Sequence, residues 1–194
     1  MKLYLIRHGQ SETNLQHRHG GWIQAPLTEK GEEDARRAGA LIAHVSFDKI
    51  YTSDLLRAMQ TADLALPEGE KEALACLREV NVGSLQGRLV AEVQAEYGED
   101  YLRNKLKKDY SPYGGETRAQ FRDRVVPFLA MLEQSDYENV AVFSHGGTME
   151  IIFELLTRSD PEKIRLSTQN GAVCLFEYAE GEWRLRVWND LGLL

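Results

Sequence analysis

Two short apolar runs, each ending in a polar residue, a histidine and a glycine, constrain the fold more than any other feature of this chain. The first reads LYLIRHG at residues 3–9, and the second reads VAVFSHGG at residues 140–147. A short continuous apolar run is typical of a strand that is covered on both faces, as in a parallel sheet. In such sheets ligands bind beyond the carboxyl ends of the strands. We therefore expect both His-Gly turns to lie at one edge of a buried sheet.

The rest of the chain alternates between strand and helix patterns. Apolar runs predict strands at residues 3–6, 49–52, 73–77 and 140–143, and two C-terminal strands at residues 172–178 and 183–188. Helical spacing predicts helices from a Thr28 cap to about Val45, and over residues 54–66, 116–134 and 148–156. This alternation predicts a three-layer α/β/α sandwich with a mostly parallel central sheet.

Two residues are expected to determine where these helices begin or bend. Ser53 is expected to cap the helix at residues 54–66, because a side-chain oxygen at this position accepts from a free backbone N–H. Pro127 is expected to kink the helix at residues 116–134 or to start a new segment there, because proline lacks the backbone donor.

Residues 84–115 break the alternation and predict a small inserted helical lid within a single domain of residues 1–194. The stretch is polar, and we expect one or two helices in it. Its lysines either bind a second anionic group of a substrate or form a solvated helix face; they are Lys105, Lys107 and Lys108. Its tyrosines either stack on a ring or pack internally; they are Tyr97, Tyr101, Tyr110 and Tyr113.

Composition narrows the class of protein. The formal net charge of the 194 residues is -7, which argues against nucleic-acid binding, because that depends on a basic surface. No apolar run approaches the roughly 18 residues that a membrane span needs. The chain runs from Met1 straight into a strand pattern without a signal peptide, so we expect a cytoplasmic protein. Cys76 and Cys174 lie in apolar surroundings and are expected to be free thiols.

The polar groups at the predicted strand ends have a common chemistry. Glycines beside His8 and His145 let backbone N–H groups approach a ligand, and Gly146 and Gly147 lead into a helix N-terminus, which favours anions. Arg7 and Arg57 add planar guanidinium groups that match phosphate or carboxylate. The sequence therefore predicts an anion site at this edge of the sheet.

Five motifs in order identify a resemblance to a known family. They are RHGQSETN, TSDLLRAMQTA, LREVNVGSLQG, YGGET and FSHGG. Together they resemble the histidine phosphatase superfamily, the phosphoglycerate-mutase-like group with the RHG motif, and specifically its short phosphatase branch. The resemblance covers residues 3–189.

The resemblance implies roles for matching residues. His8 matches the nucleophile that becomes phosphorylated, and Glu79 matches the acid that protonates the leaving oxygen. The groups that hold phosphoryl oxygens match Arg7, Arg57, His145, Asn14 and the backbone N–H of Gly146. Without the resemblance, Glu79 reads as a solvated loop carboxylate, Arg57 as an exposed helix residue and Asn14 as a turn or cap residue.

The loop at residues 17–21 departs from the family pattern. Many family phosphatases read Arg-Phe-Gln-Gly where this chain has Arg18-His19-Gly20-Gly21, so Gly20 replaces a side chain that often reaches the substrate. We place His19, Gly20 and Gly21 at the substrate side of the site. His17 and His19 form an H-x-H pair, but two ligands do not make a metal site. Two interpretations remain for these histidines: they contact a phosphate or sugar group, or they lie in a solvated loop. Gln86, where this group often carries Glu, is expected to have a minor effect.

The resemblance implies a metal-independent phosphomonoesterase that acts on a small phosphorylated metabolite through a phosphohistidine, without a cofactor. Its partner would be a small-molecule phosphate ester, and the protein would be a monomer or homodimer. The alternatives are a cofactor-dependent phosphoglycerate mutase, which is usually longer, and a non-catalytic phospholigand-binding protein. A metal hydrolase using His8 and His145 is disfavoured, because arginines do not gather around a metal cation.

Overall fold

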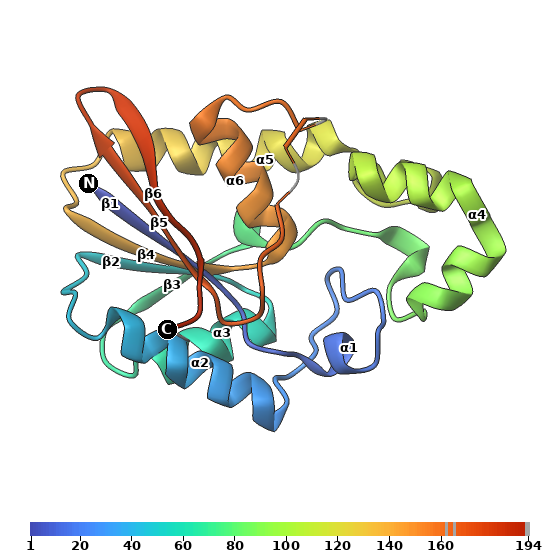
Figure 1. Cartoon of the computed structure of the whole chain (residues 1–194), viewed down its shortest axis with the longest axis horizontal. Helices are drawn as coiled ribbons and strands as arrows, with labels where there is room; N and C mark the ends of the chain where they lie inside the picture. The colour runs from blue at the N-terminus through green and yellow to red at the C-terminus, as the bar shows by residue number, and fades with distance from the viewer. Residues whose placement is uncertain (162, 165, 193–194) are drawn as a thin grey trace.

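The computed structural model describes residues 1–161, 163–164 and 166–192, and its strands form one six-stranded sheet (Figure 1). The strand order is β3-β2-β4-β1-β5-β6. The first four in this order pair in parallel, whereas β5 and β6 are antiparallel to their neighbours. The bounds are β1 Lys2–Arg7, β2 Lys49–Ser53, β3 Lys71–Leu74, β4 Asn139–Ser144, β5 Val173–Ala179 and β6 Glu182–Asp190.

Helices cover both faces of the sheet, and one long helix projects beyond it. Figure 1 shows α2 and α3 below the sheet, α5 and α6 above it, and α4 extending away to the right. The α-helices are α1 Glu12–Leu15, α2 Glu29–Ile42, α3 Leu56–Ala65, α4 Val90–Lys107, α5 Arg118–Glu133 and α6 Gly146–Thr157. Three short 3-10 helices are η1 Ala75–Leu77, η2 Gly83–Leu85 and η3 Ser111–Tyr113. The predicted α/β/α sandwich is confirmed.

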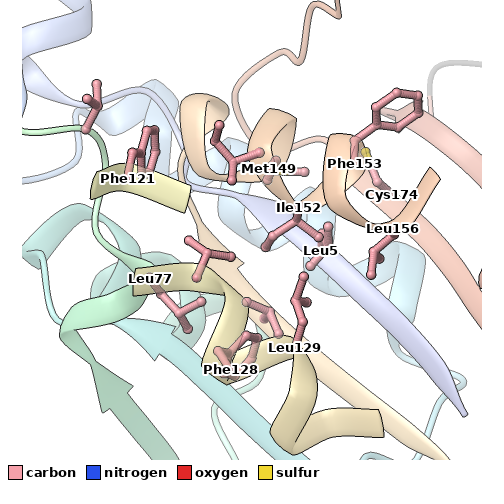
Figure 2. Packing of buried hydrophobic residues seen from close by; sticks show 14 of the residues in the cluster. Leu5, Leu77, Phe121, Phe128, Leu129, Met149, Ile152, Phe153, Leu156 and Cys174 are labelled. Atoms are coloured by element: carbon pink, nitrogen blue, oxygen red, sulfur yellow. The ribbon is translucent and has the colours of Figure 1, made fainter. Parts of the chain in front are cut away.

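Alternating side chains of β1 build the two cores. Leu3 and Leu5 pack into the larger core, together with apolar residues of α5 and α6 (Figure 2). Tyr4 and Ile6 face the opposite way, into the smaller core with α2 and α3. Because β1 is buried on both faces, its apolar run is continuous rather than alternating.

The segment at residues 84–115 contains α4, and α4 has a break at Gly98. The backbone there has φ 54 and ψ -130, which is not helical, so the helix has two arms. Glycine adopts this positive φ without the steric penalty that a Cβ would bring. This agrees with the expected one or two helices.

Three local expectations were wrong. The third strand ends at Leu74, and Ala75–Leu77 forms η1 instead of continuing it. Helix α3 begins at Leu56, two residues later than predicted, so its N-cap is Leu55; the hydroxyl of Ser53 accepts from the N–H of Leu55 at 3.3 Å and also contacts His145. Helix α5 runs through Pro127 as a single element. Pro127 faces solvent, while Val125 and Phe128 beside it are buried, so core packing outweighs the lost backbone bond, which costs about 3 kcal/mol.

Both cysteines are free: Cys174 is buried and Cys76 is half-buried. Across residues 1–161, 163–164 and 166–192, no helix is both long and apolar enough to cross a membrane.

Helix α2 meets the turn after β1 at very close range, and glycines make this contact. A Cβ added at Gly31 would lie 2.0 Å from the carbonyl oxygen of Gln10, and one added at Gly9 would lie 2.1 Å from the carbonyl oxygen of Gly31. These glycines therefore allow α2 to pack directly against the turn that follows His8.

We predict that Gly31→Ala destabilises the protein although Gly31 lies in a helix. Alanine should gain about 1 kcal/mol in helix propensity, but forcing a methyl group into this contact should cost about 2 to 3 kcal/mol. Urea unfolding should therefore show a net loss of about 1 to 2 kcal/mol. Glu33→Ala on the exposed side of α2 is the control; an equal effect of both changes would contradict the steric argument.

Candidate active site

The register of two neighbouring strands brings the predicted histidines together. Strands β1 and β4 pair in parallel with Arg7 opposite Ser144, so His8 and His145 follow at the same edge. The backbone N–H of His8 donates to the carbonyl of Ser144 at 2.9 Å. The two imidazole rings lie 5.1 Å apart between centroids.

His8 is buried, and its hydrogen bonds define its tautomer. Its Nδ1 lies 2.7 Å from the carbonyl oxygen of Gly9, and because a carbonyl only accepts, Nδ1 carries the proton. Nε2 accepts from Nε of Arg57 at 3.3 Å, so it holds the lone pair. Burial, together with the charges of Arg57 and Arg7, lowers the pKa of His8 well below its ordinary value. His8 is therefore a neutral imidazole whose Nε2 lone pair faces Arg57.

Arg57 reaches this nitrogen from the first turn of α3 and is only 2% exposed. Its two terminal nitrogens donate to the carbonyls of Ile23 and Gly21, each at 2.9 Å. Burial lowers its pKa to about 10, an effect that Glu79 opposes, so the guanidinium stays charged at neutral pH. Gly21, predicted at the substrate side, thus orients Arg57 through its backbone.

Arg7 ends β1 and supplies the second guanidinium. One terminal nitrogen donates to the carbonyl of Thr168, while its buried Nε has no hydrogen-bond partner among the described residues. A Cβ added at Gly146 would lie 3.5 Å from the guanidinium, an ordinary contact distance, so Arg7 lies against the start of α6. Within the described part of the chain, neither Arg7 nor Arg57 forms a salt bridge.

His145 is the N-cap residue of α6 and is fully buried. Its Nε2 lies 2.8 Å from Oγ of Ser53, whereas its Nδ1 is buried without a partner among the described residues. Burial is the main cause that lowers the pKa of His145, and Arg57 and His8 add to it. A bound anion would supply the missing partner for Nδ1 and favour the protonated ring.

Glu79 lies beside this cluster, held by two backbone donors. The N–H of Val80 donates to Oε1 at 2.8 Å, and the N–H of Gly147 donates to Oε2 at 3.0 Å. A Cβ at Gly147 would lie 2.1 Å from Oε1, so only glycine leaves room for the carboxylate. Glu79 is therefore not a solvated loop residue: it is fixed at the N-terminus of α6.

Trp22 is a residue of the site that sequence reasoning missed. Its indole Nε1 donates to the carbonyl of Glu79 at 2.7 Å, and its backbone N–H donates to the side chain of Gln86 at 2.6 Å. The guanidinium of Arg78 lies 4.7 Å from the indole centroid, and Arg78 in turn pairs with Asp54. Its position directly after Gly20 and Gly21 was the available signal.

The other predicted residues lie around this centre rather than in it. Asn14 forms a capping box with Ser11, and its Oδ1 accepts from Asn170, which also donates to the carbonyl of His8 at 3.0 Å. A Cβ at Gly20 would lie 3.0 Å from Oγ1 of Thr13 and 4.0 Å from a terminal nitrogen of Arg57, so this position lies beside both residues. Sequence reasoning also missed Asn170.

His17 and His19 have different environments. His17 is exposed, whereas His19 is buried, and its Nε2 lies 3.1 Å from the hydroxyl of Tyr101 in α4. Burial, with Lys105 and Arg88, lowers the pKa of His19 to about 4. The solvated-loop interpretation is therefore wrong for His19, which joins the loop at residues 17–21 to α4. In the described part of the chain, no group of three or more His, Cys, Asp or Glu side chains could hold a metal ion.

The arrangement defines a class of chemistry. A neutral imidazole nitrogen beside a guanidinium group is suited to accepting a phosphoryl group, because phosphoryl transfer needs chiefly positioning and charge stabilisation. A carboxyl group held beside them is suited to exchanging a proton with the leaving oxygen.

Comparison with known proteins agrees with this chemistry. The family model of the histidine phosphatase superfamily (branch 1) matches residues 3–191. A 2,3-bisphosphoglycerate-dependent phosphoglycerate mutase 2 of Gloeobacter violaceus is 36% identical over 176 residues, covering 84% of this chain and 78% of that protein. An adenosylcobalamin/alpha-ribazole phosphatase of Salmonella typhimurium is 31% identical over 196 residues, covering 98% and 96%. The alpha-ribazole phosphatase structure from Shigella flexneri has a TM-score of 0.85 at 29% identity, covering 98% and 97%.

The chain therefore belongs to the histidine phosphatase superfamily, as the five sequence motifs predicted. At this general level it is an enzyme of the phosphatase class.

The two buried histidines predict a pH-dependent stability. In the folded protein their pKa values are depressed, while in the unfolded chain they titrate near 6.5. As the pH falls below this value, only the unfolded state binds these protons, so the free energy of unfolding decreases by up to about 1.4 kcal/mol per pH unit for each histidine.

We predict that His8→Asn flattens this dependence. Urea unfolding between about pH 7.5 and about pH 5.5 should show a shallower loss of stability than in the unmodified protein. His44→Asn removes an exposed imidazole and should leave the slope unchanged. Parallel slopes for His8→Asn and the unmodified protein would contradict a buried neutral His8.

Proposed function

We propose that the protein is a metal-independent phosphomonoesterase that hydrolyses a small phosphorylated metabolite through a phosphohistidine at His8. In this proposal the whole chain acts as one catalytic domain, and residues 84–115 form its lid. The observation that carries the proposal is the state of His8: Nδ1 donates to Gly9, so Nε2 presents its lone pair beside Arg57. The buried Nε of Arg7, a donor without a partner among the described residues, supports an anion beside it, and Nδ1 of His145 also lacks a partner there.

The first half-reaction transfers the phosphoryl group to the protein. The lone pair of His8 Nε2 attacks phosphorus, the ester P–O bond breaks, and the leaving alcohol takes a proton from Glu79. The phosphoryl oxygens are held by Arg7, Arg57, His145 and the N–H of Gly146. The two guanidinium groups and these N–H donors supply the charge stabilisation that a metal ion supplies in other phosphatases.

The second half-reaction returns the protein to its starting state. Glu79, now a carboxylate, takes a proton from a water molecule, whose oxygen attacks phosphorus. The P–N bond breaks, and inorganic phosphate leaves. Asn14 and the loop at Gly20 and Gly21 border the substrate side in this proposal.

A phosphoglycerate mutase is the second candidate, because the relative from Gloeobacter violaceus at 36% identity is named as one. The relative from Salmonella typhimurium, at 31% identity over nearly the whole of both chains, is named as a phosphatase. Sequence identity alone does not separate the two, so the reaction itself has to be measured.

The test is hydrolysis of p-nitrophenyl phosphate with excess chelator, for the unmodified protein and for His8→Ala. We expect activity that survives the chelator and falls to background in His8→Ala. Loss of activity with chelator would overturn the metal-independent mechanism. Interconversion of 2- and 3-phosphoglycerate in the presence of bisphosphoglycerate, without phosphate release, would establish the mutase instead. Phosphate binding with neither reaction would indicate a non-catalytic phospholigand-binding protein.

The role of Glu79 gives a prediction that depends on the leaving group. Glu79→Gln should lower kcat for phenyl phosphate by about 100-fold or more, because phenolate leaves poorly without a proton. The loss for p-nitrophenyl phosphate should be smaller, because its alcohol leaves as an anion. Comparing kcat for the two esters in the same variant provides an internal control; equal losses would contradict a general-acid role.

A further inference from the structure

The YGGET motif, which begins at Tyr113, packs against the loop that carries Glu79. A Cβ added at Gly115 would lie 2.3 Å from the carbonyl oxygen of Asn81, and one added at Gly83 would lie 2.0 Å from the carbonyl oxygen of Tyr113. Glycines permit two backbones to approach this closely because they carry no Cβ. The motif is therefore in direct backbone contact with the residues that follow Glu79.

Glu116 of this motif holds the same loop through its backbone and its carboxylate. Its backbone N–H donates to the carbonyl of Asn81 at 2.9 Å, and its Oε2 accepts from the N–H of Asn81 at 2.8 Å. The carboxylate also accepts from Arg124 of α5, from Nε at 2.8 Å and from a terminal nitrogen at 3.2 Å. Glu116 thus fixes the backbone that follows Glu79 and joins it to a guanidinium group.

Arg124 holds the loop at two further points. Its Nη1 donates to the carbonyl of Cys76 at 2.6 Å, and its Nη2 donates to the carbonyl of Glu79 at 2.9 Å. With the bonds to Glu116, each nitrogen of the guanidinium has a partner in this arrangement. The side chains of Arg124 and Glu116 are only 17% and 15% exposed, so water competes little for these bonds. The ion pair therefore holds the loop from residue 76 to residue 81.

The carboxyl group of Glu79 depends on this backbone for its position. It accepts from the N–H groups of Val80 and Gly147, at 2.8 and 3.0 Å. The second bond joins two separate segments, because Gly147 lies in the first turn of α6. A shift of the loop would break this bond and move the carboxyl group relative to His8. Misplacement of a reacting group by about 1 Å can cost about 100-fold in rate.

Resting on the proposed function, we propose that the ion pair of Arg124 and Glu116 positions the general acid Glu79 by fixing the backbone of its loop. Both are positioning residues, because each acts through backbone groups of residues 76–81 and neither gives a proton to the substrate. The YGGET motif thereby serves the departure of the leaving group. Arginine suits this role, because its planar fork donates in several directions at once, unlike the single ammonium group of lysine.

The dependence on the leaving group tests this role. In Arg124→Gln, kcat/KM for phenyl phosphate should fall about tenfold, because phenolate needs the proton, whereas kcat/KM for p-nitrophenyl phosphate should change by less than about twofold. Arg122→Gln is the matched control and should change neither value, because Arg122 lies in the same helix but pairs with Glu154 of α6. Equal losses for both esters in Arg124→Gln would show a general structural role and would overturn the inference.

Combination with Glu79→Gln separates positioning of the acid from maintenance of the fold. Once the carboxyl group is absent, Arg124→Gln should cause little further loss for phenyl phosphate, whereas two independent effects would add in full. Full additivity would therefore contradict the inference.

A second variant guards against an effect of unpaired charge. Arg124→Gln leaves the carboxylate of Glu116 without its cation, so Arg124→Gln/Glu116→Gln removes both charges together. With a native circular dichroism spectrum, this double variant should show the same selective loss for phenyl phosphate. Wild-type kcat/KM for phenyl phosphate in the folded double variant would overturn the inference.

The amide of Gly147 reports the position of the carboxyl group without any reaction. Among the described residues, its N–H donates only to Glu79. Amide exchange followed by NMR should therefore be about tenfold faster at Gly147 in Arg124→Gln and unchanged in Arg122→Gln. Unchanged exchange at Gly147 in Arg124→Gln would contradict a positioning role.

These outcomes separate the inference from the proposed function. If the unmodified protein hydrolyses neither ester, the proposed function fails, and exchange at Gly147 alone decides whether the ion pair positions Glu79. If it hydrolyses both esters and Arg124→Gln leaves the ratio of their kcat/KM values unchanged, the phosphatase stands and the inference fails.

Discussion

Parallel pairing of β1 with β4 is the constraint on which the rest of the site depends. The pairing sets Arg7 opposite Ser144, and the next residue of each strand is a histidine. Strand β2 pairs with β4 on its other side, which brings Ser53 to the same edge. Three segments separated widely along the chain thus supply His8, the neighbouring imidazole of His145 and the hydroxyl of Ser53 that contacts it. A shift of one residue in this register would turn every side chain of β1 to the opposite core.

The site that results brings cationic and imidazole groups together away from water. Arg7, Arg57 and two imidazoles lie together in a buried place, and burial lowers the pKa of each group. Concentrating unpaired donors and positive charge in this way costs stability, and such costs are concentrated at functional sites. In the proposed function, a phosphate dianion offsets this cost, because it accepts from these donors and balances their charge.

One loop connects this charged centre to the lid. The carbonyls of Gly21 and Ile23 orient Arg57, and Trp22 between them holds the backbone of Glu79. In the same loop His19 bonds to Tyr101 of α4, and its backbone pairs with Arg88 just before that helix. Helix α4 is thus bonded to the same loop that orients Arg57.

The sequence by itself determined the buried strands, the polar turns at their ends, the family and the identity of the central residues. These signals are local: an apolar run, a His-Gly turn and helical spacing each depend on a few neighbouring residues. The sequence-based predictions at Pro127 and at residues 73–77 failed, because a local pattern does not report the core packing around α5 or the turn into η1. Tertiary structure alone decided which of these residues contact one another. Ser53 meets His145 across 92 positions and Trp22 meets Glu79 across 57. Lys108 is neutralised by Glu150 of another helix. No periodicity encodes such pairs, because they exist only once the sheet has brought distant segments to one edge.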